Sequence, residues 1–174
     1  MQKTYNLEVM EGAELSSIDQ KHLRTVMGHF PTGVTVVTGL YDGEPVGFTC
    51  QAFASLSLDP PLALIAPSKI SKSWPRIEAS GAFSVNILEE NQLDICKTFA
   101  ISGTGSEKFD GVEWEHGKTG SPVLSNALAW AECMLEKVYE AGDHFVVVGK
   151  VVDAGAREGR PLVYFRGGFG QLSL

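Results

Sequence analysis

The sequence predicts a mainly β protein, an antiparallel barrel with a few short flanking helices. Short apolar runs separated by hairpin-type turns follow one another along the chain, which is typical of all-β architectures. The 174 residues include 19 glycines and 8 prolines, and this composition favours turns and short strands over long helices. Because neither a repeat nor a linker interrupts the pattern, we expect one domain over residues 17–174, with a substantial core.

The first elements expected are a polar N-terminal arm over residues 1–16 and a helix that follows it. Ser17 and Gln20 have the spacing of a capping box, and apolar residues then recur at helical spacing until Pro31 ends the helix. A β-branched run and the turn signals after it predict successive strands over 34–38, 46–53 and 62–66.

In the second half, short helices alternate with longer strands. Ser71 is expected to cap a short helix that Gly81 ends, and another short helix is expected over 91–100. The polar, glycine-rich segment 101–121 predicts a long loop, of the kind that is often functional. The remaining strands are expected over 83–88, 127–139, 145–153 and 162–165.

The composition argues against several classes of protein. A formal net charge of −7 disfavours nucleic-acid binding, which needs a basic face. We find no secretory signal and no apolar run of the roughly 18 residues that a membrane span needs, so we expect a cytoplasmic protein without membrane contact. The 3 cysteines are far apart and the 4 histidines lack metal-ligand spacing, so we expect free thiols and no metal site.

One strand carries side chains that a purely structural strand would not need. Between Pro45 and Pro61, apolar residues alternate with a row of polar ones, namely Thr49, Gln51, Ser55 and Ser57. Such short hydrogen-bonding groups suit a phosphate and a polar, sugar-like chain. They could also do no more than satisfy the backbone at the edge of a sheet.

Three further patterns suit ligand binding, although each has a structural alternative. Pro31-Thr32-Gly33 could let the backbone approach a ligand closely, or be a plain helix-to-strand turn. Ser71-Lys72-Ser73 opens a helix, whose free N–H groups attract anions, or is an ordinary cap beside solvated lysines. Asp143 could hold the His144 ring in one tautomer against a bound ring system, or His144 could be structural.

Taken together and in this order, the motifs resemble those of the flavin reductase-like family, whose fold is the FMN-binding split barrel. The resemblance covers Asp19 to Leu172 and is closest to the small reductase component of two-component flavin-dependent monooxygenases. It implies an antiparallel split β-barrel of Greek-key type and a homodimer. The matching motifs include Pro31-Thr32-Gly33-Val34, Gly47-Phe48-Thr49, Ser55-Leu56-Ser57, Ser71-Lys72-Ser73-Trp74, Lys108-Phe109 and Gly142-Asp143-His144.

The resemblance also implies roles for individual residues. Thr49, Cys50 and Gln51 would line the flavin ring and ribityl chain, while Ser55, Leu56 and Ser57 would face the ribityl chain and phosphate. Ser71, Lys72 and Ser73 would complete the phosphate site. Pro31, Thr32 and Gly33 would border the ring. His144, the catalytic candidate, would lie beside the nicotinamide, and Phe169 would lie near the same pocket.

The implied reaction is hydride transfer from NADH to FAD or FMN, after which free reduced flavin reaches a partner monooxygenase. Such chemistry needs orientation rather than a protein nucleophile. The alternatives are a flavoprotein that retains FMN as an electron carrier and a non-catalytic ligand-binding barrel. The choice between FAD and FMN stays open, and NADH is only weakly favoured over NADPH.

Overall fold

The structure, a computed structural model, describes residues 17–101, 103 and 105–172. The arm expected over residues 1–16 lies outside the described residues. The helices are α1 (Gln20–Met27), α2 (Trp74–Ser80), α3 (Leu93–Ala100) and the 3-10 helix η1 (Ser106–Phe109). The strands are β1 (Thr32–Gly33), β2 (Thr35–Tyr41), β3 (Glu44–Cys50), β4 (Phe53–Leu58), β5 (Pro61–Ile65), β6 (Ala82–Ile87), β7 (Trp114–His116), β8 (Pro122–Leu124), β9 (Ala129–Ala141), β10 (His144–Ala156), β11 (Leu162–Phe165) and β12 (Gly168–Gln171).

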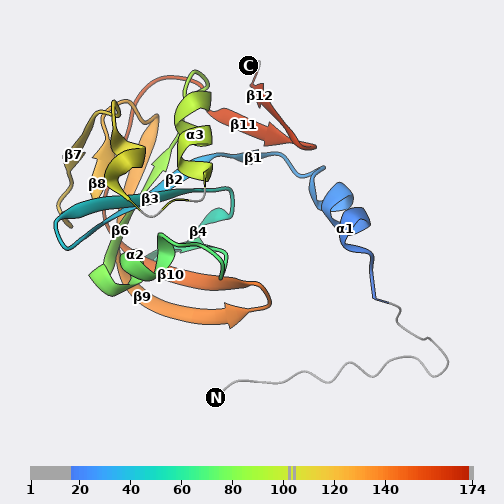
Figure 1. Cartoon of the computed structure of the whole chain (residues 1–174), viewed down its shortest axis with the longest axis horizontal. Helices are drawn as coiled ribbons and strands as arrows, with labels where there is room; N and C mark the ends of the chain where they lie inside the picture. Colours follow the sequence, from blue (N-terminus) through green and yellow to red (C-terminus); the bar gives the residue numbers. More distant parts are fainter. Residues whose placement is uncertain (1–16, 102, 104, 173–174) are drawn as a thin grey trace.

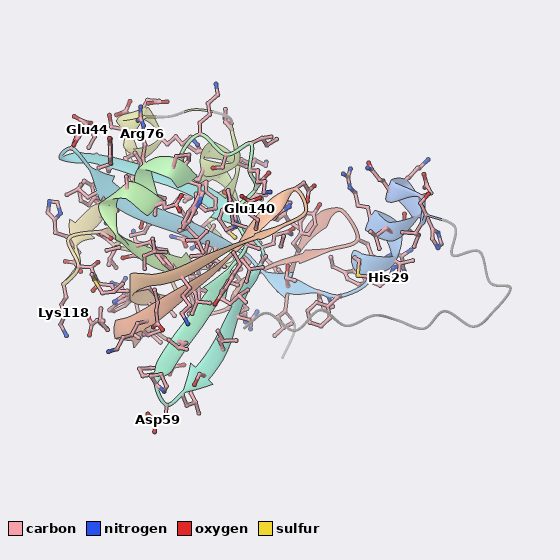
Figure 2. All side chains as sticks on the ribbon, turned by 90° about the horizontal axis from the view of Figure 1, so that it is seen from below. His29, Glu44, Asp59, Arg76, Lys118 and Glu140 are labelled. Atoms are coloured by element: carbon pink, nitrogen blue, oxygen red, sulfur yellow. The ribbon has the colours of Figure 1, made fainter. Side chains whose placement is uncertain are left out.

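An antiparallel sheet dominates the described chain, as predicted. Its seven strands have the order β3-β2-β6-β9-β10-β5-β4, so two strands of the second half of the chain lie between strands of the first half. The long β9–β10 hairpin lies near its middle, and the β4–β5 hairpin projects away from the body with Asp59 at its tip (Figure 2). The smaller sheets are β1-β11-β12 and β7-β8.

Two clusters of buried side chains form the core. One joins β2, β6 and β10 to α2 and contains Trp74, Ile77 and Phe83. The other lies under α3 and contains Phe99, which packs edge-on against Phe109 with ring centroids 4.9 Å apart. Gly47 makes the second cluster possible, because a Cβ there would lie 2.8 Å from the Phe99 ring.

Helix α1 stands away from this body at one end of the molecule (Figure 1). None of its residues is buried. The chain returns from α1 to the body through β1, which pairs with β11 and thereby joins the C-terminal β11–β12 hairpin. The apolar face predicted for this helix therefore exists, but nothing in the described chain covers it.

Several element boundaries differ from the predictions. Asp19, rather than Ser17, caps α1 by accepting a 2.8 Å hydrogen bond from the His22 N–H, and the helix ends at Met27, before Pro31. The strand expected over 46–53 breaks after Cys50, and β4 begins at Phe53.

Elsewhere, the structure adds elements that the sequence did not predict. The loop expected over 101–121 contains η1 and β7, and β12 follows the strand that was expected to be the last. Ser71 does accept the Trp74 N–H at 3.2 Å, but α2 itself begins after Ser73.

Candidate active site

A cavity of about 560 Å³ opens where the end of β3 meets α3, the segment before α2 and the C-terminal hairpin. This volume is within the range of small-molecule and cofactor sites. Separate stretches of the chain, from Val34 to Phe169, form its walls. The lining residues are Val34, Phe48, Thr49, Cys50, Gln51, Ala52, Ala66, Pro67, Ser68, Ile70, Ser71, Lys72, Ser73, Cys96, Phe99, Ala100, Ile101, Gly103, Lys108, His144, Tyr164 and Phe169.

The structure brings together eight of the predicted site residues and leaves six outside the lining. Those in the lining come from the end of β3, the segment before α2, the start of β10 and the C-terminal hairpin: Thr49, Cys50, Gln51, Ser71, Lys72, Ser73, His144 and Phe169. Those outside it belong to β4 and to the turn and strand around β1: Ser55, Leu56, Ser57, Pro31, Thr32 and Gly33.

The end of β3 forms a wall of small polar groups. Thr49 is held by its hydroxyl, which donates a 2.6 Å hydrogen bond to the Cys96 carbonyl and so ties β3 to α3. Burial raises the pKa of the Cys50 thiol to about 11, so the thiol stays protonated at neutral pH and is not a nucleophile. Gln51 follows the strand and is exposed.

The segment before α2 presents one exposed and one buried polar side chain beside Ser71. Lys72 is exposed, whereas Ser73 is buried and donates a 2.9 Å hydrogen bond to the Gly47 carbonyl. Because this bond uses the hydroxyl proton of Ser73, only the lone pairs of the hydroxyl oxygen can face a ligand. The neighbouring Lys69 is paired with Glu140 at 2.9 Å and does not line the cavity.

His144 is held as the sequence predicted. Its Nδ1 lies 2.7 Å from the Asp143 carboxylate, and this hydrogen bond lowers the pKa of Asp143. The adjacent backbone is fixed too, because the Phe145 N–H donates to the Pro67 carbonyl and the Lys69 N–H to the Asp143 carbonyl. In the neutral ring, donation of the Nδ1 proton to Asp143 leaves Nε2 as an acceptor, and the side chain is half-exposed.

An aromatic pair closes the C-terminal side of the cavity. Tyr164 of β11 packs edge-on against Phe169 of β12, with ring centroids 5.1 Å apart. Thr32 pairs in register with Tyr164, so the predicted Pro31–Gly33 turn lies beside β11, on the side away from β12. The Thr32 hydroxyl is buried and has no hydrogen-bond partner among the described residues.

The Ser55–Ser57 segment lies apart from the cavity because of how β4 pairs. This strand is at the edge of the main sheet and pairs with β5 alone, with a register shift between Ser55 and Ser57. Leu56, at the shift, is 48% exposed.

Sequence reasoning missed Lys108, which η1 carries into the cavity wall. Its side chain is 5% exposed, and its ammonium donates to the carbonyls of Gly47 and Phe99 at 3.3 and 3.4 Å. Burial lowers the pKa of this ammonium, while the nearby Glu107 carboxylate opposes the shift. The sequence signal was the Lys108-Phe109 motif, which matched the family but did not indicate that this lysine is buried in the cavity wall.

The charge of the lining differs from the charge of the chain. The whole sequence has 21 acidic and 14 basic residues, yet Lys72 and Lys108 line the cavity and none of its described lining residues is Asp or Glu. Such a site favours an anionic ligand. The described residues contain no cluster of three metal-ligating side chains and no helix long and apolar enough to cross a membrane.

Comparison with known proteins agrees with this geometry. The model of the family described as flavin reductase like domain matches residues 27–173. A reductase subunit of a flavin-dependent monooxygenase, HsaB of Rhodococcus jostii, is 48% identical over 87% of this chain and 77% of its own length. The flavin reductase of Pseudomonas putida is 41% identical over 89% of this chain and 91% of its own.

Solved structures give the same result. Nitrilotriacetate monooxygenase component B of Mycobacterium thermoresistibile has a TM-score of 0.84 and 45% identity, covering 88% of this chain and 87% of that one. The NADH:FAD oxidoreductase SgcE6 of Streptomyces globisporus has a TM-score of 0.85 and 38% identity, covering 92% and 98%. SgcE6 has also been solved with NAD and FAD fragments.

Proposed function

The chain belongs to the flavin reductase-like family, with the antiparallel split-barrel fold expected from its sequence, and we propose that it is an NAD(P)H:flavin oxidoreductase. It transfers hydride from NADH to FAD or FMN and supplies free reduced flavin to a partner monooxygenase. The names of its relatives support this reading, since they include an FMN reductase (NADH) of Agrobacterium fabrum and the reductase component of a nitrophenol monooxygenase of Rhodococcus opacus.

The observation that carries the proposal is the charge and shape of the cavity. A cavity with two lysines and no carboxylate among its described lining residues suits phosphate-bearing flavins and dinucleotides. Its aromatic pair and apolar walls suit planar rings. Bound together, the flavin and the nicotinamide supply the redox chemistry themselves, so the chain needs no nucleophile.

The residues of the cavity then act by binding and orientation. Thr49, Cys50 and Gln51 hold the flavin ring and ribityl chain, and Cys50 does so as a neutral thiol. Ser71 and Lys72 bind the phosphate. Hydride transfer needs the reacting atoms about 3–3.5 Å apart, so the fixed ring of His144 contributes by placing the nicotinamide.

The other predicted site residues have less direct roles. Pro31 and Gly33 flank the aromatic wall, because β1 pairs with β11, and the Thr32 hydroxyl is buried beside it. Phe169 flanks the rings. Ser55, Leu56 and Ser57 reach the flavin only if the bound molecule extends beyond the rim of this cavity.

We also propose that the protein is a homodimer of one split-barrel domain per chain, over residues 17–174, and that it works in the cytoplasm. The uncovered apolar face of α1 supports dimerisation, because large apolar patches on a stable monomer are uncommon. The buried free thiols of Cys50, Cys96 and Cys133 suit a reducing compartment.

The proposal is tested by following NADH consumption with FAD, FMN, riboflavin or no added flavin. We expect consumption that depends on added flavin, and hydroxylation by a monooxygenase supplied only with the products. Turnover of a yellow protein without added flavin would favour retained FMN. No consumption with any flavin would leave only a ligand-binding barrel.

The role of His144 is tested separately. His144→Ala removes the ring that orients the nicotinamide, so the KM for NADH should rise while the Kd for flavin changes little. The matched control is His116→Ala, which removes a histidine that does not line the cavity. A large loss of flavin affinity with a normal hydride step would contradict this role.

A further inference from the structure

We propose that Lys108 is a specificity residue that binds the flavin phosphate from inside the cavity and thereby favours FMN and FAD over riboflavin. This inference rests on the proposed function, and it adds a residue that lies far along the chain from the Ser71–Ser73 segment. The burial of Lys108 is at odds with its charge. The Lys108 ammonium is almost completely buried, and a buried charge is costly unless it is well paired.

The described groups around Lys108 include no ion-pair partner, although the nearby Glu107 carboxylate favours its charged form. Its two hydrogen bonds go to backbone carbonyls, and both are at the long end of the normal range. None of the ion pairs found among the described residues includes it. The adjacent Glu107 instead accepts the Gly105 N–H. When protonated, the ammonium therefore has a third proton for an anion in the cavity.

The position of the ammonium identifies which anion. The Gly47 carbonyl that accepts from Lys108 also accepts from Ser73, so one oxygen atom joins the ammonium to the segment proposed to bind phosphate. Lys72 lines the same cavity from its exposed rim. A phosphate beside Ser71 would then lie between an exposed lysine and a buried one.

The difference in burial makes the two lysines distinguishable. Salt screens exposed charges strongly and buried pairs much less. Lys72 should therefore contribute an affinity for phosphate that falls with added salt. The contribution of Lys108 should persist at high salt.

The test measures the Kd of oxidised FMN and of riboflavin by quenching of flavin fluorescence. Lys108→Met keeps most of the apolar stem and removes the charge. We expect the Kd for FMN to rise at least about tenfold, as for loss of a charged hydrogen bond, and the Kd for riboflavin to change less than about twofold. Lys150→Met, an exposed lysine on β10 outside the cavity, is the control and should change neither.

A second arm uses the unaltered protein. The ratio of the riboflavin Kd to the FMN Kd should stay well above one at high salt. A ratio that falls to one would overturn the proposal, because exposed Lys72 alone would then set the preference. An equal loss of FMN and riboflavin affinity in Lys108→Met would also overturn it. Neither result would affect the reductase function, which riboflavin-dependent NADH consumption by the unaltered protein tests independently.

Discussion

Helices α1 and α3 have the same length, eight residues, and both carry apolar side chains at helical spacing, yet only α3 is packed. Phe99 of α3 is 1% exposed, whereas Val26 and Met27 of α1 are 47% and 64% exposed. In Figure 1, α3 lies on the body of the molecule and α1 stands apart from it. An amphipathic sequence thus predicts that a face will be covered, but it does not say by what.

The two helices also differ in what they contribute to the site. The last turn of α3 supplies Phe99 and Ala100 to the cavity wall, and its Phe99 carbonyl accepts from Lys108. The contacts that pack α3 onto the body therefore also form part of the cavity wall. No residue of α1 lines the cavity, so substitutions in α1 leave the cavity lining within one chain unchanged.

The largest expected effect is on the packed helix. Phe99→Ala removes a ring that contacts Phe109 and Gly47, and should lower the free energy of unfolding by about 3–5 kcal/mol. Urea denaturation measures this change. The matched variant on the other helix, Leu23→Ala, should cost less than about 0.5 kcal/mol at concentrations where the chain is monomeric. Similar losses in the two variants would contradict the difference between the helices.

An intermediate effect is expected on association. Val26→Asp places a charge in the middle of the uncovered face of α1, so the proposed dimer should weaken at least about tenfold because the carboxylate would be buried unpaired. Sedimentation or light scattering over a range of concentrations measures this. Lys21→Glu, on the polar side of the same helix, should leave the dimer intact. If both variants dimerise normally, the face of α1 is not the interface.

The smallest effect is expected at the start of α1. Asp19→Ala removes the cap on the His22 N–H and should destabilise this helix by about 1 kcal/mol. Hydrogen exchange of the α1 amides should become faster, while the urea midpoint of the body should not move. A lower urea midpoint would show that α1 and the body unfold together.

The β class and most strands could be predicted because they depend on local pattern. The β-branched run of β2 and the alternation in β3 are such patterns, and both strands lie where expected, within a few residues. The cap of α1 was misassigned because Ser17 and Asp19 both suit that position. Only the geometry of the turn selects Asp19.

The site was harder to predict because tertiary pairing decides it. Ser55 and Ser57 continue the polar row of Thr49 and Gln51 in sequence, but β4 is a separate strand at the sheet edge and the row does not continue in space. Lys108 was missed for the opposite reason. Its loop is polar enough to suggest exposure, and only the contact of η1 with β3 and α3 buries it.

The cavity is formed by stretches that lie far apart along the chain, and this has a consequence for survival of the protein in a cell. No unfolded or partly folded chain can hold them together, so flavin binds the native state alone. A ligand at a hundred times its Kd stabilises such a state by about 2.7 kcal/mol. The lifetime of the protein should therefore rise and fall with the supply of free flavin, which makes its abundance a readout of the metabolite that it consumes.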